Sequence, residues 1–287
     1  MSPDLFILPG LSRSLPAYGT LVALALLVGW VMTVALARKR GLPGEPIGGI
    51  YVLSVFVGLF GARLLWLLQH PDQFTAAARL LEIEAGGLAI TGGLIFGLLV
   101  GWAAARLRGL PVAKVADVVA PSLLLAAALE RLGAFLAGTD FGIVVDPSFP
   151  LALRFPEGSP AWTFQRRAMP GYVFPAGGSL PVHPAQLYAM AMALAGVAWI
   201  VVWARRAPRA GAIATFAIAW YAWGRMVVED AFRVDHAQPI FGVFTAGHFT
   251  AVALTVTFIV VWATPSPSPA AAGQRGGAVP HRRPRAG

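Results

Sequence analysis

Charged side chains interrupt several long apolar runs of this 287-residue chain. Arg131 follows Glu130 in LLLAAALERLGAFLAG, and Arg225 precedes Glu229 by four residues in WYAWGRMVVED. The four-residue spacing puts Arg225 and Glu229 on one helix face, whereas adjacent residues point about 100° apart, so Glu130 and Arg131 are not expected to pair. Arg131 therefore needs another partner, since a charge at membrane depth costs several kcal/mol unless it faces protein or water.

Arginine in such surroundings suits the recognition of an anion. Its planar guanidinium binds a phosphate through two parallel hydrogen bonds and keeps its charge when water is removed. Two interpretations are open for Arg131, Arg225 and Glu229: a cationic pocket for a lipid phosphate, or structural ion pairs between helices. Arg63, in GLFGARLLW, is either a second anion contact or part of a helix interface.

The sequence VHPAQLY is the other concentrated group of polar residues. Pro184 fits the first turn of a helix, so His183 is expected near the N-cap, with Gln186 three residues further on. This pattern is typical of an ordinary helix start, and it also fits a proton-transferring histidine at the mouth of a helix. The glycines of TGGLIFG, which begins at Thr91, allow neighbouring helices to approach closely.

The elements that carry these residues are predicted to be membrane-spanning helices. Charged residues make up 12% of the chain and hydrophobic residues 57%, against about 25% charged residues in soluble proteins. Seven segments have the roughly 20 residues that a helix needs to cross the hydrocarbon core. They are 18–37, 47–68, 88–105, 115–137, 184–203, 212–231 and 245–262. The sequence predicts an all-α integral membrane protein with seven transmembrane helices.

Basic residues are unevenly distributed between the connecting segments. Thirteen lysines and arginines fall on one side of the predicted membrane and six on the other, so the N-terminus is expected outside and the C-terminus in the cytoplasm. Four regions result: helices one to four in 1–137, a small irregular or β-containing extracytoplasmic cap in 138–182, helices five to seven in 183–263, and a disordered basic tail in 264–287. Because this topology explains the net charge of +9, no nucleic-acid partner is expected.

Taken together, the motifs resemble the bacterial prolipoprotein diacylglyceryl transferase family. The resemblance covers residues 15–262 and rests on the order and spacing of AYGTLVALALLVG, GARLLWLLQHPDQF, GGLAITGGLIFG, ERLGAFLAGTDFG, VHPAQLY and GRMVVEDAFR. It implies an enzyme of the bacterial plasma (inner) membrane that moves the diacylglyceryl group of phosphatidylglycerol to the lipobox cysteine thiol of a preprolipoprotein. Its implied partners are phosphatidylglycerol, preprolipoprotein signal peptides and membrane lipids, and it implies no metal or organic cofactor.

The resemblance also assigns roles to particular residues. Cleavage of a carbon–oxygen bond beside a phosphate builds negative charge that preorganised guanidiniums stabilise, and the acceptor thiol must lose its proton to become a nucleophile. The residues expected to bind phosphatidylglycerol, by motif position or by charge, are Arg131, Tyr18, Gly142 and Arg63. The expected catalytic residues are Arg225, Glu229 and His183.

The chain departs from the family pattern where proton transfer is concerned. Thr91 stands in place of the histidine that the family uses for proton transfer, and Ala189 replaces a glutamate after His-Pro-x-Gln-Leu-Tyr. His183 is the nearest candidate for a replacement base. The fourth helix departs at further positions: Glu130 replaces glycine, Ala134 and Ala137 replace asparagines, and Thr139 replaces a glutamate for which the adjacent Asp140 is a candidate substitute.

Three other functions remain open for this sequence. A divergent paralogue would attach a lipid group to a different acceptor on the same scaffold. A non-catalytic protein would bind lipid or lipoproteins, with Thr91 and Ala134 as signs of lost chemistry. A transporter is disfavoured because the sequence has no internal repeat.

Overall fold

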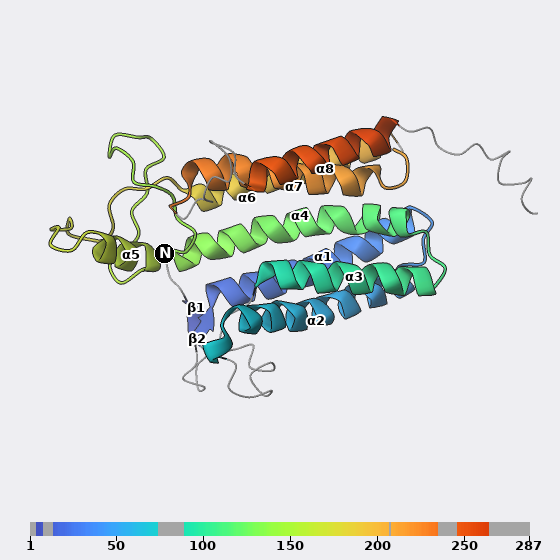
Figure 1. Cartoon of the computed structure of the whole chain (residues 1–287), viewed down its shortest axis with the longest axis horizontal. Helices are drawn as coiled ribbons and strands as arrows, with labels where there is room; N and C mark the ends of the chain where they lie inside the picture. Colours follow the sequence, from blue (N-terminus) through green and yellow to red (C-terminus); the bar gives the residue numbers. More distant parts are fainter. Residues whose placement is uncertain (1–3, 8–13, 74–88, 207, 235–245, 264–287) are drawn as a thin grey trace, which may run out of the picture.

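A bundle of long helices forms most of the molecule (Figure 1). The computed structural model describes residues 4–7, 14–73, 89–206, 208–234 and 246–263. Within these residues the long helices are α1 (Ala17–Lys39), α2 (Gly44–Gln69), α3 (Ile90–Leu107), α4 (Val112–Ala137), α6 (Ala185–Ala204), α7 (Ala212–Phe232) and α8 (Ala246–Ala263).

The helices have the composition of membrane spans. In the described residues α1, α2, α4 and α6 are long and apolar enough to cross a membrane, and α3, α7 and α8 contain shorter apolar segments. Each of the seven predicted segments corresponds to one of these helices. The prediction of an all-α integral membrane protein is confirmed.

Helix α4 is the centre of the bundle. It packs against α1 on one side and against α6 and α7 on the other. The contact with α6 and α7 is made by buried apolar side chains, among them Leu124, Ile200 and Ile213. A side chain on α4 can therefore contact either α1 or the pair of α6 and α7.

The glycines of TGGLIFG bring α3 close to α2. A Cβ atom added to Gly97 would lie 3.0 Å from the carbonyl oxygen of Ser54, and one added to Gly58 would lie 3.1 Å from that of Gly93. Only glycine allows this approach without displacing the neighbouring helix. In the described residues this motif packs helices together.

The cap between α4 and α6 contains a helix that the sequence did not predict. Helix α5 (Pro160–Ala168) begins at Ser159, whose hydroxyl accepts a hydrogen bond from the Trp162 amide at 3.2 Å. Serine at the N-cap followed by proline is a standard helix start, but nine residues are too few to show a clear period. The rest of the cap contains isolated bridges from Val182 to Val144 and Leu153.

The two ends of the bundle differ in composition. The cap lies at one end, together with the antiparallel strands β1 (Asp4–Ile7) and β2 (Ser14–Pro16), which the sequence did not predict (Figure 1). The short basic connections at residues 38–40, 106–114, 205–206 and 208–209 lie at the other end. The predicted tail, 264–287, lies outside the described residues.

Candidate active site

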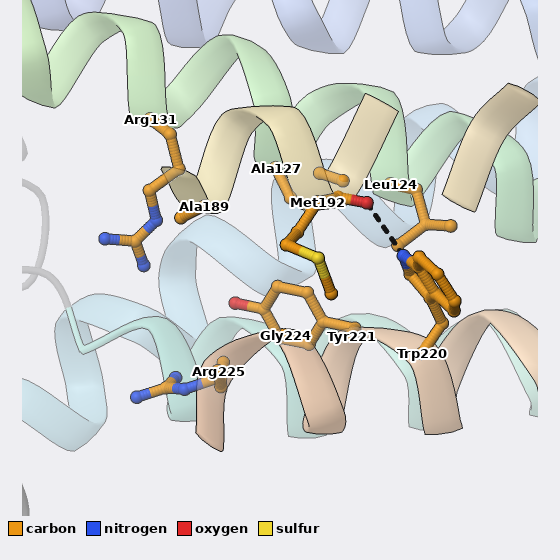
Figure 2. Close-up of a pocket in the computed structure, with 10 residues that line it drawn as sticks. Leu124, Ala127, Arg131, Ala189, Met192, Trp220, Tyr221, Gly224 and Arg225 are labelled. Carbon is orange, nitrogen blue, oxygen red and sulfur yellow. Dashed lines mark hydrogen bonds between the residues drawn. The ribbon is translucent and has the colours of Figure 1, made fainter. Parts of the chain in front are cut away.

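A pocket between α4, α6 and α7 brings Arg131 and Arg225 together (Figure 2). Both guanidiniums extend in the same direction, and the hydroxyl of Tyr221 points toward the space between them. The rest of the lining is apolar or small: Leu124, Ala127, Ala189, Met192, Ala193, Trp220 and Gly224. Two guanidiniums beside an apolar lining suit an anion that carries an apolar portion, because the guanidiniums bind the charge and the apolar side chains accept the rest.

The two arginines lie at a similar depth in the bundle. Arg131 is six residues before the end of α4, and Arg225 is seven before the end of α7. At the helical rise of 1.5 Å per residue, both lie about 10 Å inside the cap end. Deeper in the pocket the indole Nε1 of Trp220 donates a 2.7 Å hydrogen bond to the carbonyl of Met192, which joins α7 to α6.

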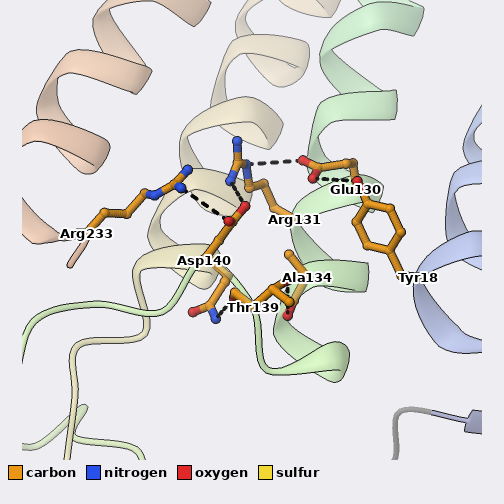
Figure 3. Close-up of polar contacts among 8 residues, drawn as sticks. Tyr18, Glu130, Arg131, Ala134, Thr139, Asp140 and Arg233 are labelled. Atoms are coloured by element: carbon orange, nitrogen blue, oxygen red, sulfur yellow. Dashed lines mark hydrogen bonds and ion pairs between the residues drawn. The ribbon is translucent and has the colours of Figure 1, made fainter. Parts of the chain in front are cut away.

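Arg131 is also the middle member of a row of five polar side chains (Figure 3). Its guanidinium lies 2.7 Å from Asp140 Oδ2 and, through Nε, 3.2 Å from Glu130 Oε2. The other oxygen of Asp140 accepts a hydrogen bond from Arg233 at 3.2 Å. The other oxygen of Glu130 accepts one from the hydroxyl of Tyr18 at 3.3 Å. The row, called here the Arg131 row, joins α1, α4, the start of the cap and the residue after α7.

The expectation that Glu130 and Arg131 do not pair is wrong. The rule about neighbouring residues describes where the Cβ atoms point, but both side chains are long enough to bend toward each other, and they meet at 3.2 Å. The expectation that Arg131 has a further partner agrees with its contact to Asp140. Arg131 itself is 7% exposed, so both carboxylates compensate a charge that is largely removed from water.

The turn that carries Asp140 is built by the residues around the end of α4. Gly138 ends the helix in the left-handed region with φ 73°, and Asp140 also has a positive φ of 54°. Aspartate tolerates this region better than most residues. The amide of Gln186, a residue 1% exposed in the first turn of α6, donates to the carbonyl of Thr139 and holds the turn in place.

Gly142 and His183 contact each other through their backbones and help to position the residues of the site. The amide of Gly142 donates to the carbonyl of His183 at 3.1 Å, and Gly142 forms a β-bridge with Arg233. A Cβ atom at Gly142 would lie 2.7 Å from the Cβ of His183 and 2.8 Å from the Phe232 carbonyl. Glycine is therefore required there by close packing, and its contacts hold Arg233 beside Asp140.

The imidazole of His183 lies in an aromatic cluster. Its Nδ1 is 3.2 Å from the hydroxyl of Tyr188, and its ring makes edge contacts with Phe149 and Phe232. The lining of the arginine pocket does not include it. The structure thus places His183 next to the backbone of the site, and not at the position where Arg131 and Arg225 meet.

The remaining predicted residues either lie outside the lining of the arginine pocket or have side chains outside the described residues. Arg63, on α2, is 3% exposed and lies over the ring of Trp66 at 5.1 Å, whereas the pocket lining comes from α4, α6 and α7. Glu229 follows Arg225 by about one turn of α7, and Thr91 lies in the first turn of α3. The side chains of Glu229 and Thr91 lie outside the described residues.

Arg233 is a member of the site that the sequence analysis did not predict, although it follows Glu229 by only one turn of helix. Among the described side chains, the pocket and the Arg131 row together hold three guanidiniums and two carboxylates. This part of the site is therefore net positive by one charge.

Comparison with known proteins identifies the family of the chain. The family model described as prolipoprotein diacylglyceryl transferase matches residues 5–264. Relatives named phosphatidylglycerol–prolipoprotein diacylglyceryl transferase include that of Geobacillus kaustophilus, 29% identical over 85% of this chain and 86% of the relative. The relative from Bifidobacterium adolescentis is 33% identical over 77% of this chain and 68% of the relative. The relative from Shouchella clausii is 27% identical over 85% of this chain and 84% of the relative. The chain belongs to the prolipoprotein diacylglyceryl transferase family.

Proposed function

We propose that this protein transfers the diacylglyceryl group of phosphatidylglycerol to the lipobox cysteine thiol of preprolipoproteins. The pocket in which Arg131 and Arg225 meet carries the proposal. Its two guanidiniums suit the phosphate of the lipid, and its apolar wall suits the glyceryl ester portion. Membership of the family supports the same reaction.

In the proposed reaction the thiolate attacks the glyceryl carbon that bears the phosphate. A carbon–sulfur bond forms, the carbon–oxygen bond breaks, and the electron pair stays on the oxygen of the departing glycerol phosphate. Negative charge therefore grows on the phosphate in the transition state. Arg131 and Arg225 stabilise that charge, and loss of one such donor typically lowers kcat by about 10²–10³-fold.

The carboxylates around Arg131 are partners that a phosphate is able to replace. Asp140 also binds Arg233 at 3.2 Å, so it keeps one cationic partner when Arg131 turns toward the lipid. Glu130 likewise keeps the hydroxyl of Tyr18. Asp140 thus keeps a cationic partner and Glu130 keeps a hydrogen-bond donor, which lowers the energetic cost of releasing the buried arginine.

The proposed location is the bacterial plasma (inner) membrane, with the N-terminus outside and the C-terminus in the cytoplasm. The basic connections lie at the bundle end opposite the cap (Figure 1), and the positive-inside rule puts such connections in the cytoplasm. The arginine pocket then opens toward the outer leaflet. Phosphatidylglycerol of that leaflet and the preprolipoprotein signal peptide are the proposed partners.

The proposal is tested with purified protein in phosphatidylglycerol nanodiscs and a lipobox peptide. Mass spectrometry is expected to detect a thioether-linked diacylglyceryl peptide and released glycerol phosphate. Arg131→Lys should lower the rate at least tenfold, because a point charge does not reproduce the bidentate fork, while Arg205→Lys at the opposite end should act as wild type. Absence of product with wild type, or equal rates for the two variants, would contradict the proposal. Consumption of lipid without a labelled peptide would indicate another acceptor.

A further inference from the structure

We propose that Tyr18 and Glu130 form the route by which the acceptor thiol loses its proton in this chain. The hydroxyl of Tyr18 takes the proton of the thiol and passes its own proton to the carboxylate of Glu130. This inference rests on the proposed transferase function. It gives a role to Glu130, at a position where the family pattern has glycine.

The reaction needs a proton acceptor because a free thiol is a poor nucleophile. With an ordinary pKa of about 8.5, only a few per cent of a cysteine is thiolate at neutral pH. Threonine stands at position 91, where the resemblance expects a histidine. The ring of His183 is held among Phe149, Tyr188 and Phe232, with its Nδ1 3.2 Å from the hydroxyl of Tyr188. Among the described side chains we therefore look for the acceptor in the Arg131 row.

The two described carboxylates of the Arg131 row are not equivalent. Asp140 binds one guanidinium through each of its oxygens, Arg131 at 2.7 Å and Arg233 at 3.2 Å. Glu130 binds Arg131 through one oxygen at 3.2 Å, and its other oxygen accepts the hydroxyl of Tyr18. A proton can reach Glu130 through the existing hydrogen bond from Tyr18. Both oxygens of Asp140 are bound by guanidiniums, so Glu130 is the better acceptor.

Tyr18 is placed to act between the substrate and Glu130. It lies in the first turn of α1, at the cap end, and 39% of its surface is exposed. The other edge of its ring is packed against α4, where a Cβ atom at Gly133 would lie 3.3 Å from the ring. The hydroxyl is thereby directed at Glu130 (Figure 3), and the exposed part leaves room for an incoming thiol.

The row also links proton transfer to lipid binding. When a phosphate takes Arg131, a negative charge arrives beside Glu130 and the guanidinium moves from its carboxylate, so protonation of Glu130 is favoured at that moment. The thiolate then displaces the phosphate, and the proton held by Glu130 returns through Tyr18 to the departing glycerol phosphate. One thiol proton is thus moved to one leaving group, and no other reactant is required.

The variant Glu130→Gln distinguishes two roles for Glu130, that of a proton acceptor and that of a purely structural carboxylate. Wild type is expected to show a kcat/KM that is nearly flat from pH 6 to 8. The variant should lose about 300-fold at pH 6 and recover about tenfold per pH unit up to about pH 8, because only preformed thiolate reacts. Tyr18→Phe should show the same slope, and Glu130→Asp should keep part of the flat profile. Glu45→Gln, at an exposed position far from the cap, serves as the matched control.

Phosphatidylglycerol binding completes the test. Glu130→Gln removes a competitor for Arg131, so the variant should bind the lipid in nanodisc titrations at least as tightly as wild type. A rate that falls by the same factor at every pH, or a variant as active as wild type at pH 6, would overturn the inference. If Glu130→Gln fails to fold, the profile of Tyr18→Phe decides by the same criterion. Failure of wild type to form any thioether would instead reject the proposed function itself.

Discussion

The two ends of α4 each bury a charge, but they hold it in different ways. Near the start of the helix, Asp117 is 2% exposed and accepts hydrogen bonds from the backbone amides of Gly211 at 2.7 Å and Ala214 at 2.8 Å. Near its end, Arg131 is 7% exposed and is bound by the side chains of Glu130 and Asp140.

The difference lies in the partners. The amides that hold Asp117 are the first donors of α7, which have no partner within that helix, so the carboxylate acts as a cap supplied by another helix. Those amides cannot move without α7. The carboxylates that hold Arg131 are side chains with second partners of their own, and a pocket opens beside them. A charge fixed by backbone serves the fold, and a charge held by exchangeable side chains is available to a substrate.

The strongest way to break this comparison is to remove the arginines of the pocket. Arg131→Ala and Arg225→Ala should each lower kcat/KM by about 10²–10³-fold, equivalent to about 3–4 kcal/mol of transition-state stabilisation. The double variant should lose far less than the product of the two, because residues that act on one group are not additive. Kinetics on the four proteins give the coupling energy. Fully multiplicative losses would show that the two side chains act on different groups.

Asp117→Ala tests the other end of the helix. It should lower the stability of the bundle by about 1–3 kcal/mol, because the first amides of α7 lose their acceptor. Thermal unfolding in detergent measures the loss, and the rate per folded molecule should stay within about twofold of wild type. A stable Asp117→Ala protein with a lost rate would place Asp117 among the reacting groups and remove the contrast with Arg131.

Thr91→His carries the smallest expected effect. Installing the histidine that the family resemblance expects should leave the rate unchanged or raise it severalfold, since the protein would then carry a second proton acceptor in addition to Tyr18 and Glu130. The comparison is sharpened by a double variant that combines Thr91→His with Glu130→Gln. In it, Thr91→His should partly restore the activity that Glu130→Gln loses at pH 6. Complete loss of activity in the single variant would indicate a site rebuilt around threonine.

Sequence patterns were sufficient for the bundle because continuously apolar segments of about 20 residues satisfy their backbone hydrogen bonds in a membrane as helices. They also indicated that Arg131 and Arg225 would converge on one cavity, and both residues line the pocket between α4, α6 and α7. The contacts of Arg131 were not accessible in the same way. They depend on the turn at Asp140, which is fixed by the left-handed Gly138 and by Gln186 from a helix 47 residues away.

Two further features lay beyond the sequence for the same reason. Asp117 appears in the sequence as one more polar residue of an apolar helix, and only the approach of α7 reveals what it caps. Arg63 carries the same kind of charge as Arg131, yet it lies over Trp66 on a helix outside the pocket lining. Residue type and depth predict that a buried charge has a partner, whereas tertiary packing decides which partner.

The central claim is that one lipid phosphate is bound by both Arg131 and Arg225. A structure of the protein with phosphatidylglycerol in a nanodisc tests this claim most directly. We expect phosphate oxygens within hydrogen-bonding distance, about 3 Å, of the guanidiniums of both Arg131 and Arg225, with Asp140 turned to Arg233. A phosphate bound by only one of the two, with Arg131 still held by Glu130 and Asp140, would contradict the account.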